Sequence, residues 1–157
     1  MTLPLRAQKM LLDQAFPGEH CTLRGQALQW EGWLTPSAFS RHYRIRVDYK
    51  LRQAPDIVVL EPDLHTIANS ILPDRPLPHV YSQQPVRLCV YMPATGEWHS
   101  SKAIAVTIIP WSIVWLDFFE DWVFSNVWSG GGVHPDTKPD QPTSETETGL
   151  HLNIQEK

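Results

Sequence analysis

The chain has 157 residues, a formal net charge of −4 and two cysteines. This length fits one domain with a full hydrophobic core, and the small net charge argues against nucleic-acid binding driven by bulk charge. Two cysteines are too few for a disulfide framework, and the first residues lack a signal-peptide pattern. We therefore expect a protein of the reducing cytoplasm, where a thiol stays available for chemistry.

The first third of the chain predicts one helix followed by strands. Residues 5–16 are amphipathic and are followed by Pro17, which predicts a helix. Residues 21–34 predict one strand in which Gly25 and Gly32 allow a bulge. Over residues 40–52, apolar and charged residues alternate, which predicts a strand with one face in the core and one in water. The charged face is more typical of a solvated surface than of a site for an acidic partner.

The middle of the chain predicts less regular structure. Residues 56–60 predict a third strand, and residues 63–78, which contain three prolines, predict an irregular crossing. Residues 88–91 predict a short extended piece, and Thr95-Gly96 predicts a turn.

A long helix is predicted from Thr107 to about Trp128. Thr107 could cap its first turn, and Pro110 lies in that turn, where a missing N–H does little harm. The Ser-Gly-Gly-Gly run of residues 129–132 would end the helix. Residues 103–116 are strongly apolar, but Pro110 and three nearby acidic residues interrupt the longer run. A helix buried in a protein core is therefore favoured over a membrane span.

The last part of the chain differs in composition from the rest. Residues 135–157 are rich in Pro, Thr, Glu, Asp and Gln and predict a flexible acidic tail, which leaves residues 1–134 as the folded domain. The elements in order indicate an α+β fold, an antiparallel meander flanked by an N-terminal helix and a long C-terminal helix.

Cys89 is the candidate catalytic residue. It lies in an apolar, strand-like segment, ten positions after His79 and nine positions before Trp98. A cysteine thiolate can attack a carbonyl carbon and hold the acyl group as a thioester. Taken alone, a cysteine in such a segment is more often a buried packing residue, so its surroundings in the sequence decide between the two interpretations.

The order of these pieces resembles that of the ubiquitin-conjugating enzymes. In that family an N-terminal helix, an antiparallel meander, a His-Pro-Asn motif, a catalytic cysteine ten positions after its histidine, a tryptophan and a helix follow one another. The chain is more closely similar to stand-alone bacterial members encoded beside cGAS-like nucleotidyltransferases in cyclic-oligonucleotide antiphage (CBASS) operons. The similarity covers residues 5–135, and its pieces are Pro78-His79-Val80-Tyr81, Arg87-Leu88-Cys89-Val90-Tyr91, Gly96-Glu97-Trp98, Thr107-Ile108-Ile109-Pro110-Trp111 and Trp128-Ser129-Gly130-Gly131-Gly132-Val133-His134-Pro135.

The resemblance implies a transferase with Cys89 as its thioester carrier. Its substrate would be the C-terminal tail of a cGAS-like nucleotidyltransferase, its acceptor a lysine or another amine, and its product would prime antiphage signalling. A separate activating enzyme would supply an ATP-dependent step, or the carrier would load in some other way, because the glycine run of this sequence follows a helix rather than opening one as a phosphate loop does. No cofactor or metal is expected, since the histidines are scattered and form no ligand pairs with the cysteines.

The sequence departs from the family pattern beside His79. Val80 and Tyr81 stand where the family has Pro and Asn. The resemblance implies that this asparagine stabilises the oxyanion during attack by an amine; here Tyr81 could donate its hydroxyl instead, or backbone amides could. Transfer to lysine is therefore less firmly predicted than thioester formation. His79 could activate the thiol, but the resemblance favours a structural role for it in the active-site loop.

Four further features of the sequence have a structural explanation as well as a possible role in catalysis or binding. Cys21 lacks comparable surroundings and is predicted to pack in the core, and Trp98 is predicted to pack beneath the active-site loop. His134 could approach the thiol, but a helix stop that leads into a loose tail is favoured for its segment. The aromatic residues of positions 111–122 recur at helical spacing, which predicts a core face or a partner surface.

Two other functions remain open. A conjugating-type fold without chemistry could act as a binding module for the partner's tail; the missing asparagine favours this hypothesis, and the spacing of Cys89 counts against it. A cysteine peptidase fits less well, because no second group that would orient His79 is evident in the sequence.

Overall fold

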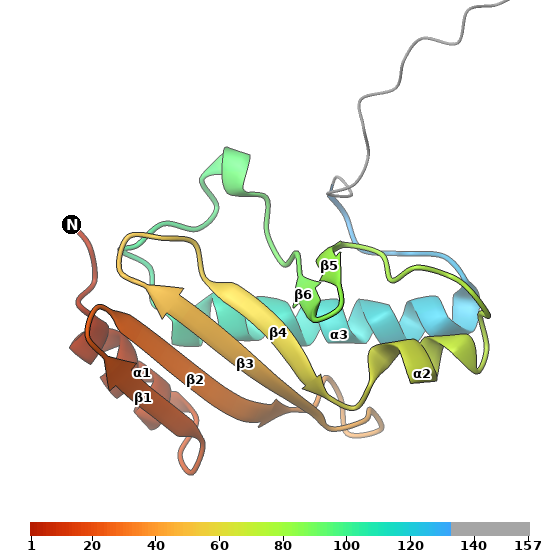
Figure 1. Ribbon diagram of the computed structural model, residues 1–157, viewed down its shortest axis with the longest axis horizontal. Coiled ribbons are helices and arrows are strands. Elements are labelled where there is room, and N and C mark those ends of the chain that lie inside the picture. Colours follow the sequence, from red (N-terminus) through yellow and green to blue (C-terminus); the bar gives the residue numbers. More distant parts are fainter. Residues whose placement is uncertain (133–157) are drawn as a thin grey trace, which may run out of the picture.

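The computed structural model describes residues 1–132, which form a six-stranded antiparallel sheet with helices against it (Figure 1). The strand order β1-β2-β3-β4-β6-β5 makes β1 and β5 the two edges. The predicted tail of residues 135–157, its boundary after residue 134, and His134 lie outside the described residues. The elements are α1 (Leu5–Ala15), β1 (His20–Arg24), β2 (Ala27–Leu34), β3 (Tyr43–Lys50), β4 (Asp56–Glu61), α2 (Leu64–Asn69), β5 (Val80–Gln83), β6 (Val86–Leu88), the short 3-10 turns η1 (Pro93–Thr95) and η2 (Ile104–Val106), and α3 (Ile108–Ser125).

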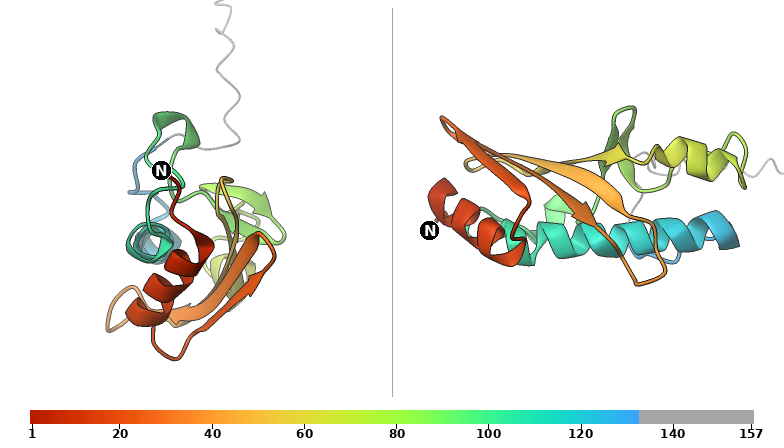
Figure 2. Two further views of the ribbon diagram at one scale, coloured as in Figure 1. Left: turned by 90° about the vertical axis from the view of Figure 1, so that its left-hand side faces the viewer. Right: turned by 90° about the horizontal axis from the view of Figure 1, so that it is seen from below.

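The core lies between one face of the sheet and the helices α1 and α3, which both lie on that face (Figure 2). Strand β3 shows why the sequence folds this way. Its alternate residues Tyr43, Ile45, Val47 and Tyr49 are almost completely buried, whereas the residues between them reach the opposite face. The predicted α+β class, the N-terminal helix and the alternation of β3 are confirmed.

The outer face of the sheet carries ion pairs. Arg44 of β3 bonds to Glu31 at 2.8 Å and to Glu61 at 3.0 Å, so one guanidinium joins three neighbouring strands. Arg46 similarly contacts Asp48 at 2.7 Å. These basic side chains already have acidic partners within the sheet, as expected for a solvated surface.

The prediction of one strand over residues 21–34 is wrong. The segment is a hairpin in which β1 pairs with β2 through a tight turn, and Gly25 adopts a positive φ of 59° in that turn. Such a backbone conformation favours glycine because it has no Cβ. Gly32 lies in regular register rather than in a bulge, and a Cβ there would come within 2.3 Å of the Trp30 ring.

The region between β4 and Cys89 is more regular than predicted. Residues 63–78 contain α2, whose N-terminus is capped by Asp63: its carboxylate accepts hydrogen bonds from the His65 amide at 3.0 Å and the Thr66 hydroxyl at 2.8 Å. The predicted three-strand meander is extended by the hairpin β5–β6, which pairs with β4 through Val58 and Arg87. This hairpin carries the candidate site.

Helix α3 is confirmed, but both of its ends differ from the prediction. The Thr107 hydroxyl donates to the Ala103 carbonyl at 2.7 Å instead of capping the helix. The helix ends at Ser125, because Asn126 adopts a left-handed conformation with φ 59°. Residues 126–132, named the post-helix strap from here on, turn back from the end of α3 toward β5 (Figure 1, blue). Within the described residues, no helix is long and apolar enough to cross a membrane.

Candidate active site

Cys89 directly follows β6 and is held by backbone contacts. Its amide donates a hydrogen bond to the carbonyl of His79 at 3.0 Å, which closes the open end of the β5–β6 hairpin. Its thiol lies 3.7 Å from the Tyr91 carbonyl, within the reach of a weak S–H hydrogen bond. The side chain is half-buried. Cys89 is therefore fixed in place while the residue remains partly exposed.

Tyr81 is brought to Cys89 by an irregularity in β5. Val80 pairs with Leu88 and Ser82 pairs with Arg87, so Tyr81 is the extra residue of a β-bulge. A bulge changes the direction of a side chain relative to a regular strand, and here it brings the Tyr81 hydroxyl near enough to the Cys89 thiol to affect the pKa of that hydroxyl.

The surroundings of Tyr81 raise the pKa of its hydroxyl. Partial burial is the main cause, and the hydrogen bond to Cys89 and the negative charge of its thiolate add to it. The hydroxyl therefore stays protonated at any pH near neutrality and can donate to a negatively charged atom. The sequence identified Tyr81 as a candidate donor, and the structure puts it in contact with the thiol.

His79 contributes its backbone as well as its ring. It has a positive φ of 49°, and its carbonyl accepts hydrogen bonds from both the Cys89 amide and the indole N–H of Trp115, at 2.9 Å. Its ring stacks on Trp128 with 5.0 Å between ring centroids and 19° between planes. His79 thus links the cysteine to α3 and to the post-helix strap.

A narrow pocket of about 80 Å³ opens beside the thiol. Its walls come from the residues that flank the β5–β6 hairpin, from α3 and from the post-helix strap. The lining residues are His79, Cys89, Val90, Trp111, Val114, Trp115, Phe118, Trp128, Gly130 and Gly131. Three of the aromatic residues predicted to form a core face or a partner surface, Trp111, Trp115 and Phe118, therefore also line the candidate site.

Trp128 is a site residue that the sequence analysis missed. It was predicted as the last residue of α3, but in the strap its ring packs against Trp115 at 5.5 Å and Phe118 at 5.9 Å, besides His79. Asn126, a residue that readily takes the left-handed conformation, was the available sign of an earlier helix end. Nothing in the periodicity showed where the chain would go afterwards.

The loop after Cys89 arches away from the sheet before it reaches α3 (Figure 1, green). Trp98 anchors this loop: it is buried, and its ring contacts Tyr49 and Tyr91 at centroid distances of 5.6 and 6.3 Å. Gln8 of α1 fixes the far end, because its amide group donates to the Lys102 carbonyl at 2.8 Å and accepts from the Ile104 amide at 2.9 Å. The prediction that Trp98 packs into the protein is confirmed.

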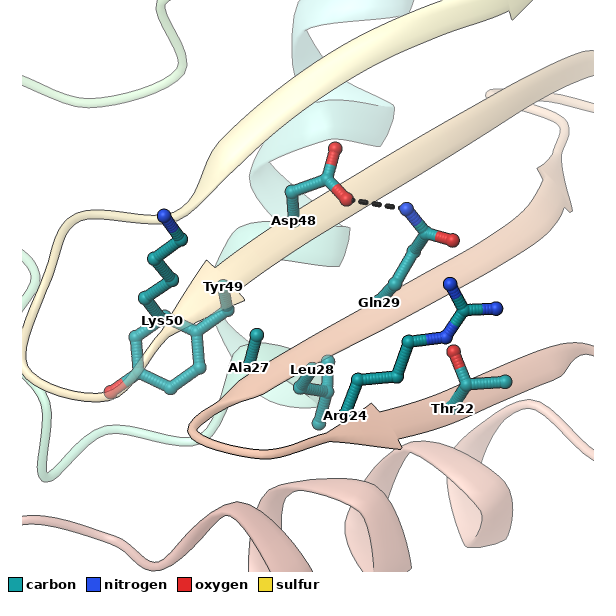
Figure 3. A pocket seen from close by; sticks show the side chains of 8 residues that line it. All are labelled: Thr22, Arg24, Ala27, Leu28, Gln29, Asp48, Tyr49 and Lys50. Carbon is teal, nitrogen blue, oxygen red and sulfur yellow. Dashed lines mark hydrogen bonds between the residues drawn. The ribbon is translucent and has the colours of Figure 1, made fainter.

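The second cysteine does not combine exposure with a neighbouring pocket as Cys89 does. Cys21 is buried on the opposite edge strand, β1, where burial raises the pKa of its thiol to about 11. Its predicted packing role is therefore confirmed. A larger cavity of about 270 Å³ lies over β1, β2 and β3, where Gln29 donates to Asp48 at 2.7 Å (Figure 3), but its lining residues include no cysteine or histidine. Within residues 1–132, no group of three or more His, Cys, Asp or Glu residues could hold a metal ion.

Comparison with known protein families identifies one family that includes this site. A family model described as type II CBASS E2 protein matches residues 8–135. The matched region contains most of α1, the whole sheet, α3 and the post-helix strap, and therefore His79, Tyr81 and Cys89. No curated protein matches the chain.

Proposed function

Because the chain belongs to the family of type II CBASS E2 proteins, we propose that it is a ubiquitin-conjugating-like transferase with Cys89 as its thioester carrier. Its cargo is the C-terminus of a cGAS-like nucleotidyltransferase, which it passes to an amine to prime antiphage signalling. The observation that carries this proposal is a partly exposed cysteine at the wall of a narrow pocket, with the Tyr81 hydroxyl nearby. A reducing cytoplasm would keep both cysteines free, as they are in the fold.

The chemistry proceeds in two substitutions at one carbonyl carbon. The Cys89 thiolate attacks an activated C-terminal carbonyl, a carbon–sulfur bond forms, and the activating group leaves. An amine then attacks the thioester, the carbon–sulfur bond breaks, and the amine loses a proton as the amide forms. A separate activating enzyme supplies the activated C-terminus, and the transferase itself needs no metal or cofactor.

Tyr81 takes over the donor role of the family's asparagine in this proposal. Its hydroxyl first stabilises the thiolate and then turns toward the oxyanion, which forms on the carbon bonded to the sulfur. Its raised pKa supports this role, because a protonated hydroxyl is required for donation. His79 acts as a positioning residue, since its carbonyl holds the Cys89 amide at 3.0 Å.

The test is co-expression of the chain with the nucleotidyltransferase encoded beside its gene. Non-reducing gels of the wild type should show a covalent adduct that disappears with a thiol reductant and with hydroxylamine, which cleaves thioesters and leaves disulfides intact. Cys89→Ala should abolish the adduct, and Cys89→Ser should give an ester that resists the reductant. Cys21→Ala is the matched control and should leave the adduct unchanged.

Two results would contradict the proposal. An adduct that resists hydroxylamine but yields to the reductant would be a disulfide. A stable non-covalent complex that forms equally well with Cys89→Ala would leave the protein as a binding module for the partner's tail.

A further inference from the structure

The outer face of the sheet carries a groove that shares no lining residue with the thiol pocket. It measures about 270 Å³ and is formed by β1, β2 and β3 (Figure 3). In the register of these strands, Arg24, Ala27 and Lys50 form one cross-strand row. The short side chain of Ala27 therefore forms a small apolar floor between the long side chains of Arg24 and Lys50.

The groove has a local excess of positive charge. Within residues 1–132, no acidic side chain forms an ion pair with Arg24 or Lys50. The carboxylate of Asp48 also lines the groove, but it already accepts hydrogen bonds from Gln29 and Arg46, both at 2.7 Å. The other arginines in the strands have acidic partners within the sheet; they are Arg44, Arg46 and Arg87.

The C-terminal part of the chain supplies carboxylates with a matching spacing. Residues 135–157 contain five acidic residues and two lysines. Glu145 and Glu147 are separated by one residue, so in an extended chain their side chains point to the same side, about 7 Å apart. Arg24 and Lys50 lie two strand spacings apart, about 10 Å, a separation that long side chains can bridge.

The described chain ends near the same end of the sheet as the groove. Its last residue, Gly132, lies beside His79, because a Cβ atom at Gly132 would be 3.9 Å from the ring. Strands β3 and β6 both pair antiparallel with β4, so Lys50 and Cys89, at or just after their carboxyl ends, lie at one end of the sheet.

The intervening chain is long enough to reach the groove. Three strand spacings, about 14 Å in all, separate β6 from β2 in the sheet order. The chain from Gly132 to Glu145 spans 13 residues and extends up to about 45 Å. The surplus allows the chain to pass round the edge of the sheet to its outer face.

We propose that this groove docks the C-terminal segment of the same chain, with Glu145 and Glu147 against Arg24 and Lys50. The extended backbone of the segment crosses above Ala27, where the short side chain leaves room. Each exposed ion pair contributes little by itself, so docking depends on the covalent link, which keeps the segment at a high effective concentration. Because the pairs are exposed, salt weakens them. The inference does not depend on the proposed thioester chemistry.

Carbodiimide cross-linking of the full chain tests this contact. The reagent activates a carboxylate, and a lysine amine within reach then forms an amide with it. Peptide mapping of the monomeric fraction should find Glu145 or Glu147 joined to Lys50, at least about fivefold more often than to Lys9 or Lys102, because tethered contact raises the local concentration. The ion pair between Lys9 and Asp13, 2.8 Å apart, is an internal standard for the coupling reaction.

Two charge variants sharpen the test. Arg24→Gln keeps the reactive lysine but removes one of the two cations, so the cross-link to Lys50 should fall about threefold or more. Arg6→Gln is the matched control, because Arg6 is an exposed cation on α1, and it should leave the yield unchanged. Raising the salt from about 20 mM to about 500 mM should lower the yield in the wild type.

The tail offers a second matched pair. Glu145→Gln combined with Glu147→Gln should shift the backbone amide resonances of Arg24, Ala27 and Lys50 in the spectrum of the ¹⁵N-labelled full chain. Asp136→Asn combined with Asp140→Asn removes the same charge from the tail and should leave these three resonances in place.

Three results would overturn the proposal. The first is equal coupling of the tail carboxylates to Lys9, Lys50 and Lys102. The second is an equal effect of Arg24→Gln and Arg6→Gln on the cross-link. The third is a cross-link found only between a labelled and an unlabelled copy, which would assign the groove to a second molecule. Formation or loss of the thioester adduct has no bearing on any of these results.

Discussion

The two cysteines of the chain lie in regions that are built in opposite ways. Cys21 belongs to the edge strand β1, where α1 covers it and leaves it 8% exposed, and burial raises the pKa of its thiol to about 11. Cys89 lies near the other edge of the sheet, half-buried, next to a pocket and near the Tyr81 hydroxyl. One cysteine thus packs in the core at one edge of the sheet, whereas the other is the candidate nucleophile near the opposite edge.

The difference arises from what covers each edge. Helix α1 lies directly on β1 and β2, and the Lys9 ammonium even donates to the Cys21 carbonyl at 2.9 Å. Near β6, the covering is shared between α3 and the post-helix strap, which meet through aromatic rings and leave a gap beside the sulfur. The comparison teaches that access to the thiol, more than its position in a strand, separates a packing cysteine from a candidate nucleophile.

The largest expected effect is a difference in thiol reactivity. We expect iodoacetamide to alkylate Cys89 about 100-fold faster than Cys21 at pH 7.5, because a thiol with a pKa of about 11 is almost entirely protonated and this one is also buried. Since the pH lies below that pKa, the Cys21 rate should rise about tenfold per unit between pH 8 and 10. Peptide mapping by mass spectrometry measures both sites in one sample. Equal alkylation rates at Cys21 and Cys89 would contradict the expected difference in reactivity between the two thiols.

The second prediction concerns the anchor between the α1 region and the loop after Cys89. Gln8→Ala leaves the Lys102 carbonyl and the buried Ile104 amide without their partner. The free energy of unfolding should fall by about 2 kcal/mol, the loss expected when buried polar groups lose their hydrogen bonds. Urea denaturation measures this change.

Gln14→Ala is the matched control for Gln8, because Gln14 lies exposed on the same helix. It should change the unfolding free energy by less than about 0.5 kcal/mol. An equal loss for both variants would mean that the Gln8 hydrogen bonds do not stabilise the loop.

The smallest expected effect tests Tyr81. Tyr81→Phe removes the hydroxyl near the thiol and keeps the ring. The rate at which a small-molecule thioester of N-acetylglycine acylates Cys89, followed by intact mass, should fall about tenfold, the value of one hydrogen bond to a charged atom.

Tyr91→Phe provides the control for this prediction. Tyr91 contacts Cys89 through its backbone carbonyl, which the substitution retains. Its loading rate should therefore stay near that of the wild type. If the two variants slow loading equally, the Tyr81 hydroxyl has no special role at the thiol.

Local patterns in the sequence were sufficient to predict the main helices and strands. Alternation of apolar and charged residues predicted β3 and the face it buries, because side chains in a strand point to opposite sides in turn. The helical spacing of aromatic residues predicted α3, and the separation of Cys89 from His79 pointed to the site through its family resemblance. Where the local signal was weak, as in the short helix α2, the prediction failed.

By itself, then, the amino-acid sequence determined the α+β class, the buried faces and the candidate nucleophile, since each depends on side-chain periodicity or on spacing along the chain. Tertiary structure alone decided that Tyr81 meets Cys89, because the pairing register of β5 and β6 creates the bulge. It also decided that Trp128 returns to His79 and closes the pocket, because packing between distant segments leaves no period in the sequence.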